Sequence, residues 1–251
     1  MPLLRLSEPR KWLFCFAHPD DELAVAATMK RLLSNGHELY CLWTHSTDTR
    51  KSEAIAGARH LGIPESNLYF LSGTDGSICD ELLEILPTYR DIVSKVNPDT
   101  VAVGAFEQGH LDHDATRLLV HECFQGEILE FPLYHWYRFR SIQRMNQFTI
   151  NDDSEVFPLH IEEIKMKISM ARLYPSQTIF KALTLNHWYE KIIRKKSKTI
   201  EREILRIPNT FHFAEPNHPP KLAKKIKKHH RWKRWEKALA RFNEHKKGTI
   251  N

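Results

Sequence analysis

Short apolar runs alternate with helical patterns through the first half of this 251-residue chain. The predicted strands lie at about residues 11–16, 38–44, 67–71, 100–103 and 127–134. The predicted helices between them lie at about residues 22–35, 51–61, 80–96 and 112–121. Alternation of this kind is typical of βαβ units. We therefore expect an α/β fold, in which a Rossmann-like sheet of mainly parallel strands, ordered 3-2-1-4-5, is flanked by helices.

The second half of the chain is less regular. The predicted helices lie at about residues 159–173, 178–206 and 221–245. Residues 207–220 contain four prolines and resemble a linker. We expect a core domain over residues 1–177 and a basic, largely helical C-terminal extension over residues 178–251.

Charge is divided unevenly along the chain. Residues 1–150 carry 14 Lys and Arg against 20 Asp and Glu, whereas residues 151–251 carry 23 against 11. The densest basic run, residues 221–235, includes Trp232 and Trp235. Such a run is able to attract an anionic membrane surface, nucleic acid or an acidic substrate. A solvated terminal helix with a basic outer face is the alternative.

Two further features bear on the compartment. No apolar run approaches the roughly 20 residues that span a bilayer, and the N-terminus lacks the apolar core of a signal peptide. The four cysteines are scattered without a CxxC pair. We therefore expect a reduced, cytoplasmic protein, with peripheral attachment to a membrane through the basic tail as an addition.

A polar motif follows the first predicted strand. Residues 17–22 read Ala-His-Pro-Asp-Asp-Glu, so an imidazole and three carboxylates lie at a strand's carboxyl end, where open α/β sheets bind ligands. One His and one Asp are able to bind a divalent metal while the second Asp moves a proton. An acidic helix start is the alternative explanation.

A second motif follows the fourth predicted strand. Residues 109–113 read Gly-His-Leu-Asp-His. In the expected strand order, strands one and four are neighbours, so the two loops converge. His18 and Asp21 from the first loop and one His from the second would supply two nitrogens and one oxygen. Three protein ligands with an open position describe a catalytic zinc site.

Together these motifs resemble the PIG-L/LmbE-like zinc de-N-acetylases, and the resemblance covers roughly residues 11–177. Shorter matches lie at Arg50-x-x-Glu53, at Asp75-Gly76 and at residues 167–177. The chain departs from the family pattern at residues 44–50, which have no glycine, and at Gln108. Both regions line the substrate pocket in relatives, so the departures affect the substrate rather than the metal.

The resemblance implies a role for each motif residue. His18, Asp21 and His113 correspond to the metal ligands, with Zn²⁺ as the metal or another divalent ion such as Fe²⁺ in its place. Asp20 corresponds to the general base, although exchanged roles for Asp20 and Asp21 remain an alternative. A metal at such a site lowers the pKa of its water to about 7 and polarises the acetyl carbonyl.

Four further residues are given roles around this centre. The resemblance assigns His110 to stabilising the tetrahedral oxyanion, a task that suits an imidazolium, and Asp112 would favour that charged form. A helix N-cap is the alternative for Asp112. Arg50 and Asp75 are candidates for binding substrate hydroxyls or anionic groups. The alternatives are a solvated position at a helix start for Arg50 and a turn position for Asp75.

Two residues near these motifs are not given a part in the chemistry. We expect Glu22 to support its loop through backbone hydrogen bonds. We expect His45 to be a surface residue, with a position bordering the site as the alternative.

The resulting hypothesis is a metal-dependent hydrolase that removes an N-acetyl or other N-acyl group from an amino sugar or glycolipid. The alternative class is a basic protein that binds nucleic acid or a membrane surface and retains a vestigial metal site. The sequence retains the residues expected as metal ligands, as general base and as oxyanion stabiliser. Their presence favours an enzyme over a protein that only binds nucleic acid.

Overall fold

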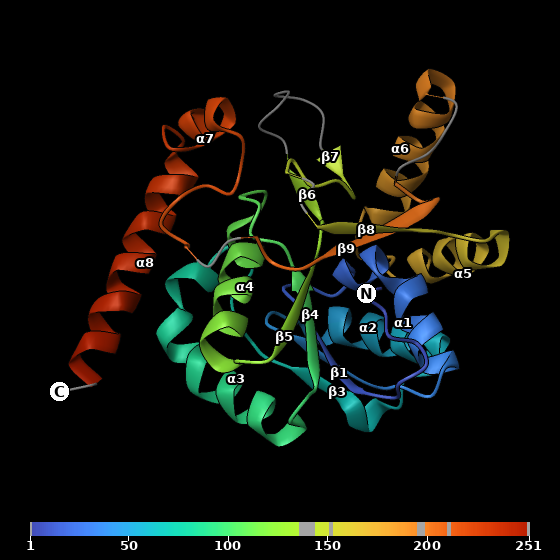
Figure 1. Ribbon diagram of the computed structural model, residues 1–251, viewed down its shortest axis with the longest axis horizontal. Helices are drawn as coiled ribbons and strands as arrows, with labels where there is room; N and C mark the ends of the chain where they lie inside the picture. Colours follow the sequence, from blue (N-terminus) through green and yellow to red (C-terminus); the bar gives the residue numbers. More distant parts are fainter. Residues whose placement is uncertain (1, 136–143, 151–152, 195–198, 210–211, 250–251) are drawn as a thin grey trace.

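The computed structural model describes residues 2–135, 144–150, 153–194, 199–209 and 212–249. Five parallel strands form the centre of its main sheet (Figure 1). They are β1 (Lys11–Phe16), β2 (Glu38–Trp43), β3 (Leu68–Phe70), β4 (Thr100–Gly104) and β5 (Glu127–Phe131). Their order is β3-β2-β1-β4-β5, which confirms the predicted topology.

Two antiparallel strands extend the sheet beyond β5. β9 (Arg202–Arg206) pairs with β5, and β8 (Ser154–Pro158) pairs with β9. The prediction of helix through residue 206 is therefore wrong at its end. Glu203 and Arg206 resemble solvent-facing helix residues in the sequence, but both are buried and paired with other charged side chains. Charged residues are rarely buried unless they are paired, so the sequence pattern of β9 does not indicate a buried strand.

Helices cover both faces of the sheet. One face packs against α1 (Ala26–Ser34), α2 (Asp48–Leu61) and α5 (Ile161–Ala171). The opposite face packs against α3 (Leu82–Val96), which contains Pro87, and α4 (Leu111–Cys123). Alternate residues of β1 supply the two cores, because successive strand side chains point to opposite faces. Trp12 and Phe14 join the first core, and Leu13 joins the second.

Short elements connect these layers. A two-stranded sheet is formed by β6 (Tyr134–His135) and β7 (Arg144–Met145). Single-turn 3₁₀ helices are η1 (Asp21–Ala24), η2 (Glu65–Asn67) and η3 (Ile78–Asp80). Because the last two residues of the first motif, Asp21 and Glu22, belong to η1, α1 starts only at Ala26, later than predicted.

The C-terminal region forms α6 (Ile179–Arg194), α7 (Pro220–Ile226) and α8 (His230–Thr249). The single terminal helix predicted over 221–245 is thus two helices, and α8 lies along α3 and α4 (Figure 1). Trp232 and Trp235 are 1% and 0% exposed and belong to the second core. These two indoles are therefore not available to a membrane surface, because they form the apolar side of an amphipathic helix packed on the body.

Segments from both sides of residue 177 share one sheet and one core. β9 lies between β5 and β8, and α8 packs in the same core as α4. The division into residues 1–177 and 178–251 stays a prediction about domain organisation. No helix in the described part of the chain is long and apolar enough to cross a membrane.

Glu203 of β9 fixes the start of α1. Its carboxylate accepts hydrogen bonds from the backbone N–H groups of Ala27 and Thr28, at 3.0 and 2.7 Å. The Nζ atom of Lys167 on α5 donates to the same carboxylate at 2.7 Å, and both charged side chains are buried. One side chain therefore satisfies the unpaired N–H groups of a helix start and neutralises a buried ammonium group.

Replacing Glu203 by Ala should lower the free energy of unfolding by about 3–5 kcal/mol, because it leaves Lys167 buried without a counter-charge. Urea denaturation measures the loss. Glu162→Ala is the matched control, since Glu162 forms an exposed pair with Lys165 worth at most about 1 kcal/mol. Equal losses in the two variants would contradict the role given to Glu203.

His218 anchors the segment that leads into α7. Its Nε2 atom lies 2.7 Å from the carbonyl oxygen of Glu107, and its Nδ1 atom lies 2.7 Å from the hydroxyl of Thr149. Burial lowers the pKa of His218 from 6.5 to about 4, outweighing the hydrogen bond to Glu107. The folded chain therefore excludes a proton that the unfolded chain binds between these two pH values.

Stability should consequently be highest above pH 6.5 and fall as the pH drops toward 4, by up to about 3 kcal/mol from this residue. Chemical denaturation at several pH values measures the slope. In the His218→Gln variant, the free energy of unfolding should lose this component of its pH dependence. The remaining pH dependence comes from the other titrating groups. A variant with the wild-type pH dependence would show that His218 does not carry it.

Candidate metal and catalytic site

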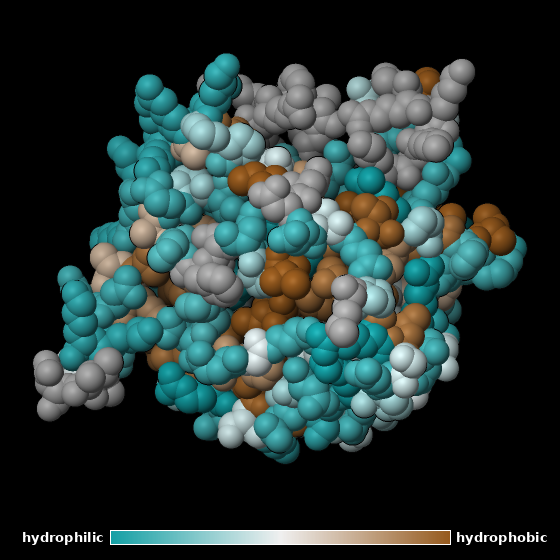
Figure 2. Space-filling model, viewed as in Figure 1, coloured by the Kyte–Doolittle hydropathy of each residue, from teal (hydrophilic) through white to brown (hydrophobic). Residues whose placement is uncertain are grey.

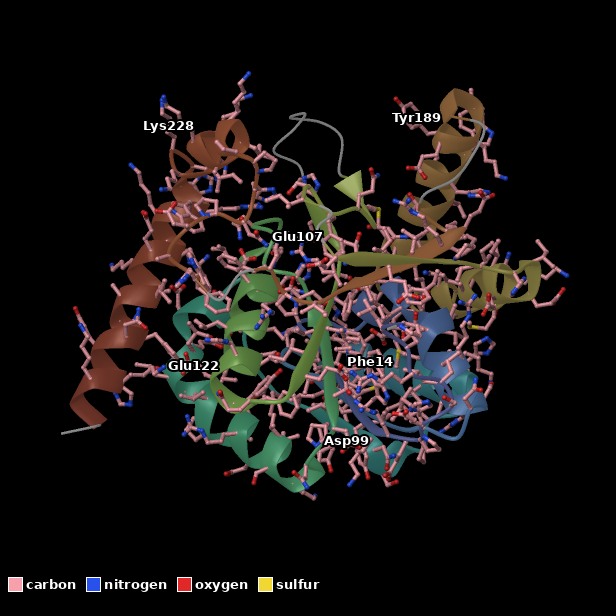
Figure 3. All side chains as sticks on the ribbon, viewed as in Figure 1. Phe14, Asp99, Glu107, Glu122, Tyr189 and Lys228 are labelled. Atoms are coloured by element: carbon pink, nitrogen blue, oxygen red, sulfur yellow. The ribbon has the colours of Figure 1, made fainter. Side chains whose placement is uncertain are left out.

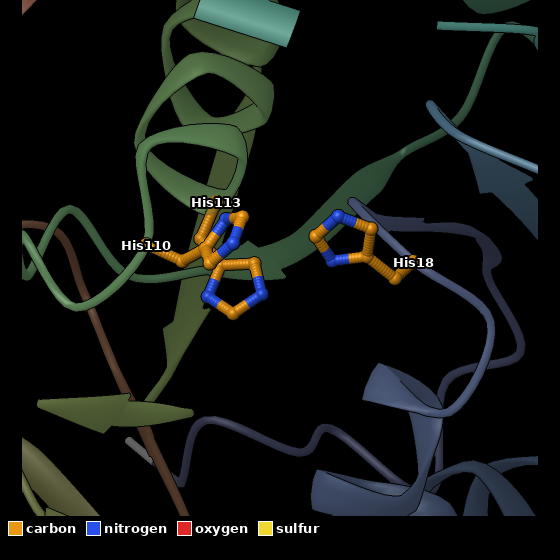
Figure 4. A group of neighbouring side chains, drawn as sticks. All are labelled: His18, His110 and His113. Atoms are coloured by element: carbon orange, nitrogen blue, oxygen red, sulfur yellow. The ribbon is translucent and has the colours of Figure 1, made fainter. Parts of the chain in front are cut away.

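The loops after β1 and β4 meet at the carboxyl edge of the sheet, as predicted. His18 comes from the first loop, and His110 and His113 come from the second, at the start of α4 (Figure 4). Ligand atoms of these three imidazoles lie within 4.8 Å of one another, close enough to bind one metal ion. Their ring centroids are 5.1 to 5.4 Å apart.

His18 is oriented by carboxylates. Its Nε2 atom lies 3.0 Å from Oδ2 of Asp112 and 3.2 Å from Oδ1 of Asp75. Burial lowers the pKa of His18, but these two hydrogen bonds and the charge of Asp21 raise it to about 10 overall. When Nε2–H donates to Asp112, the lone pair of Nδ1 is available to a metal, the arrangement in which a carboxylate positions a ligating histidine.

Asp21 lies between the two predicted histidine ligands. Its Oδ1 atom is 3.3 Å from Nε2 of His113, and its Oδ2 atom is 3.9 Å from Nδ1 of His18. Oδ2 also accepts hydrogen bonds from the backbone N–H groups of Ala17 and His18, which fix the carboxylate against its own loop. His18, Asp21 and His113 therefore lie close together in space, and their role as metal ligands stays a prediction.

The donor set fits a divalent metal. Nδ1 of His113 is buried and has no hydrogen-bond partner among the described residues, which is costly unless another group binds there. Imidazole nitrogens and carboxylate oxygens are the donors that Zn²⁺ prefers in catalytic sites. A second group of close ligand atoms, from His18, Asp75 and Asp112, adds negative charge next to the first.

Asp20 adopts a backbone conformation that is rare for its residue type. Its φ of 112° is left-handed, and its N–H donates to Oε2 of Glu22 at 2.8 Å. Burial and the charge of Asp21 raise the pKa of Asp20 well above its usual range, while Arg50 opposes this shift. Strained backbone beside a buried acid of raised pKa is typical of functional sites.

His110 differs from its predicted state. Burial and the neighbouring His113 lower its pKa to about 4, although Asp112 acts in the opposite direction. The ring is therefore neutral near pH 7, rather than the imidazolium that we expected. Its Nδ1 atom accepts the backbone N–H of Asp112 at 3.2 Å, so the neutral ring carries its proton on Nε2.

Asp112 is not the helix N-cap, which is His110. Its fully buried carboxylate accepts the N–H groups of Gly76 at 2.7 Å and Ile78 at 3.2 Å. It thereby ties the loop after β3 to His18. The backbone of Asp112 positions His110, whereas its carboxylate positions His18.

Arg50 and Asp75 both border the site. Arg50 donates to the carbonyl oxygen of Pro19 at 3.0 Å and lies 3.7 Å from Oδ1 of Asp20 and 3.4 Å from Oδ2 of Asp75. Its Nε atom is buried without a hydrogen-bond partner among the described residues. The hydrogen bond from His18, ahead of the effect of burial, lowers the pKa of Asp75 below its usual range.

Glu22 supports the loop through a backbone hydrogen bond, as expected. Besides the N–H of Asp20, its carboxylate accepts hydrogen bonds from Nε1 of Trp43 at 3.2 Å and from the hydroxyl of Tyr174 at 2.5 Å. The carboxylate of Glu22 is thus bound to three separate parts of the chain.

His45 borders the site, which was the alternative to the surface position expected from sequence. It is 6% exposed, its Nδ1 atom lies 2.6 Å from the carbonyl oxygen of Gly73, and its ring lies 5.7 Å from that of His18. Its position directly after β2, at the same sheet edge as the two motifs, was the signal that could have placed it in the site.

Comparison with known proteins supports the family resemblance inferred from sequence. Residues 13–124, which include both motif loops, match the family model PIG-L, described as GlcNAc-PI de-N-acetylase. The predicted resemblance to the PIG-L family is confirmed. The comparison with curated proteins gave no match.

Solved deacetylase structures share the fold. A deacetylase of teicoplanin biosynthesis is 15% identical, with a TM-score of 0.54 over 80% of this chain and 100% of the other. The zinc-inhibited form of teicoplanin deacetylase is 14% identical, with a TM-score of 0.56 and the same coverage. The N,N'-diacetylchitobiose deacetylase of Pyrococcus horikoshii is 18% identical, with a TM-score of 0.56 over 83% of this chain and 87% of the other.

Proposed function

We propose that this chain is a metal-dependent N-deacetylase that hydrolyses the N-acyl group of an amino sugar or glycoconjugate. The observation that carries the proposal is the convergence of His18, Asp21 and His113 beside the strained acid Asp20. The PIG-L match and the deacetylase folds support the same reaction class. Zn²⁺ is the proposed metal, with Fe²⁺ as the alternative.

In this proposal His18, Asp21 and His113 bind the metal, which polarises the acyl carbonyl and acidifies a water when bound. Asp20 accepts the proton of the attacking water and later delivers it to the departing amine. Arg50 keeps Asp20 oriented through the carbonyl of Pro19 and the contact with Oδ1.

His110 stabilises the oxyanion of the tetrahedral intermediate as a neutral donor. Because its Nδ1 accepts the N–H of Asp112, its Nε2–H is directed away from that bond and is free to donate. A donor fixed before the reaction begins costs no reorganisation when negative charge develops. Arg50 and Asp75, on the polar side of Asp20, are proposed to bind sugar hydroxyls.

Two variants separate metal binding from proton transfer. His113→Ala should lose the metal, measured by elemental analysis after loading with Zn²⁺ or Fe²⁺, and should lose acetate release with it. Asp20→Asn should keep about one metal per chain but lose at least 100-fold in kcat on N-acetylated sugars. Full activity in Asp20→Asn would show that Asp20 is not the base, and metal retention in His113→Ala would exclude His113 as a ligand.

We further propose that the enzyme is cytoplasmic and attaches to an anionic membrane surface. The attachment we propose is through α6 rather than through the basic tail. Leu185, Trp188, Tyr189 and Ile192 on α6 are each 45–66% exposed and share one helix face. Figure 3 shows Tyr189 on a part of α6 far from the body. Residues 194–198 continue as Arg-Lys-Lys-Ser-Lys. Aromatic and aliphatic residues flanked by basic ones are typical of helices that bind membrane interfaces.

Trp188→Ser should therefore reduce cosedimentation with vesicles of mixed neutral and anionic lipids at least several-fold, because an interfacial anchor is lost. Lys228→Ser, in the exposed loop between α7 and α8 (Figure 3), is the comparison for the basic tail. Binding to an oligonucleotide but not to vesicles would favour the nucleic-acid alternative. Binding to neither would exclude both.

A further inference from the structure

An apolar cavity lies beside the proposed catalytic carboxylates, with a volume of about 100 Å³. Asp20 and Asp21 form one wall. The apolar part of the lining includes Leu23, Ala24, Leu133, Met145, Ile179 and Leu183. Figure 2 shows apolar surface near the centre of the molecular face, framed by hydrophilic residues.

Three polar side chains in the other walls bind to the protein itself, and Tyr134 adds a phenol ring to the lining. The Nζ atom of Lys167 donates to Glu203 at 2.7 Å, and the amide nitrogen of Asn146 donates to the carbonyl oxygen of Arg202 at 2.7 Å. The hydroxyl of Thr199 donates to Glu190 at 2.9 Å. Away from Asp20 and Asp21, the cavity therefore presents mainly hydrocarbon to a ligand.

Asp20 marks the boundary between this cavity and a charged surface. Its carboxylate faces Arg50 at 3.7 Å, and Arg50 in turn faces Asp75 at 3.4 Å, while Asp20 itself also lines the cavity. The carbonyl carbon of an amide bears two substituents, the nitrogen with its sugar and the acyl chain. A sugar needs polar partners, which lie on the Arg50 side, so the acyl chain is left for the apolar side.

We propose that the cavity binds the acyl chain, and that the preferred substrates carry an N-acyl group longer than acetyl. This inference rests on the proposed function. Since an apolar cavity of about 150 Å³ binds benzene, with six carbons, this one accommodates roughly three to five carbons beyond the carbonyl. Hydrolysis breaks the C–N bond. The water oxygen joins the acyl carbon, one water proton stays with the resulting carboxylic acid, and the other is transferred to the departing amine.

Binding of product-like acids tests the cavity without requiring the correct sugar. Isothermal titration of the zinc-loaded protein with acetate, propanoate, butanoate, pentanoate and decanoate gives Kd as a function of chain length. Kd should fall roughly fourfold for each buried methylene up to about pentanoate and then level off. Equal Kd values across the series would overturn the proposal.

Two substitutions on one helix provide the matched control. Ile179→Trp fills the cavity from the N-terminus of α6 and should abolish the preference for longer acids, so that Kd no longer falls with chain length. Leu185→Trp lies on the exposed side of the same helix and should keep the wild-type preference. If Ile179→Trp does not fold, judged by circular dichroism, Ile179→Ala should instead shift the optimum to longer acids. A preference unaffected by either change would also overturn the proposal.

Hydrolysis of N-acetyl-, N-butanoyl- and N-hexanoyl-glucosamine, followed by amine release, separates this inference from the proposed function. Higher kcat/KM for the butanoyl than for the acetyl compound is expected. Hydrolysis of the acetyl compound alone would leave the deacetylase function standing and reject the acyl cavity. Chain-length-dependent acid binding without any hydrolysis would support the cavity and count against the reaction.

Discussion

The pairing of β1 with β4 is the contact on which the site depends. The two strands are parallel neighbours, with Trp12 opposite Thr100 and Cys15 opposite Val103, so their following loops leave the sheet side by side. His18 and Asp112, which are 94 positions apart in sequence, therefore come within 3.0 Å. Asp112 then connects the loop after β3 through Gly76. Sheet order, rather than local loop structure, assembles the site.

This dependence explains why the centre of the molecule could be predicted from sequence. Strand and helix periodicity gave the order of the five parallel strands, and the order placed the two motifs together. The orientation of each ring could not be predicted, because it depends on hydrogen bonds across the fold. His110 is neutral on account of burial and His113, and His45 is buried against Gly73 rather than exposed.

The outer strands and the C-terminal helices were harder to predict, for a single physical reason. Buried ion pairs make interior residues look like surface residues: Arg206 and Glu130 pair at 2.8 Å, both almost fully buried. Arg117 completes this group from α4, with its Nε atom 2.7 Å from Glu130. Conversely, basic residues beside Trp232 and Trp235 suggested a surface segment, although both indoles pack in the core. Analysis of the hydropathy pattern treats charged residues as exposed to solvent. It therefore gives the wrong structure where charged side chains form ion pairs with one another in the interior.

The position of β9 between β5 and β8 has a consequence for the order of folding. The N–H groups at the start of α1 and the ammonium group of Lys167 both bind Glu203, which lies 175 positions after Thr28. During synthesis from the N-terminus, the βαβ half emerges long before its last strand partners exist. Such distant pairing favours slow closure of the sheet. Lys167, which also lines the cavity beside Asp20, receives its counter-charge only when β9 is in place.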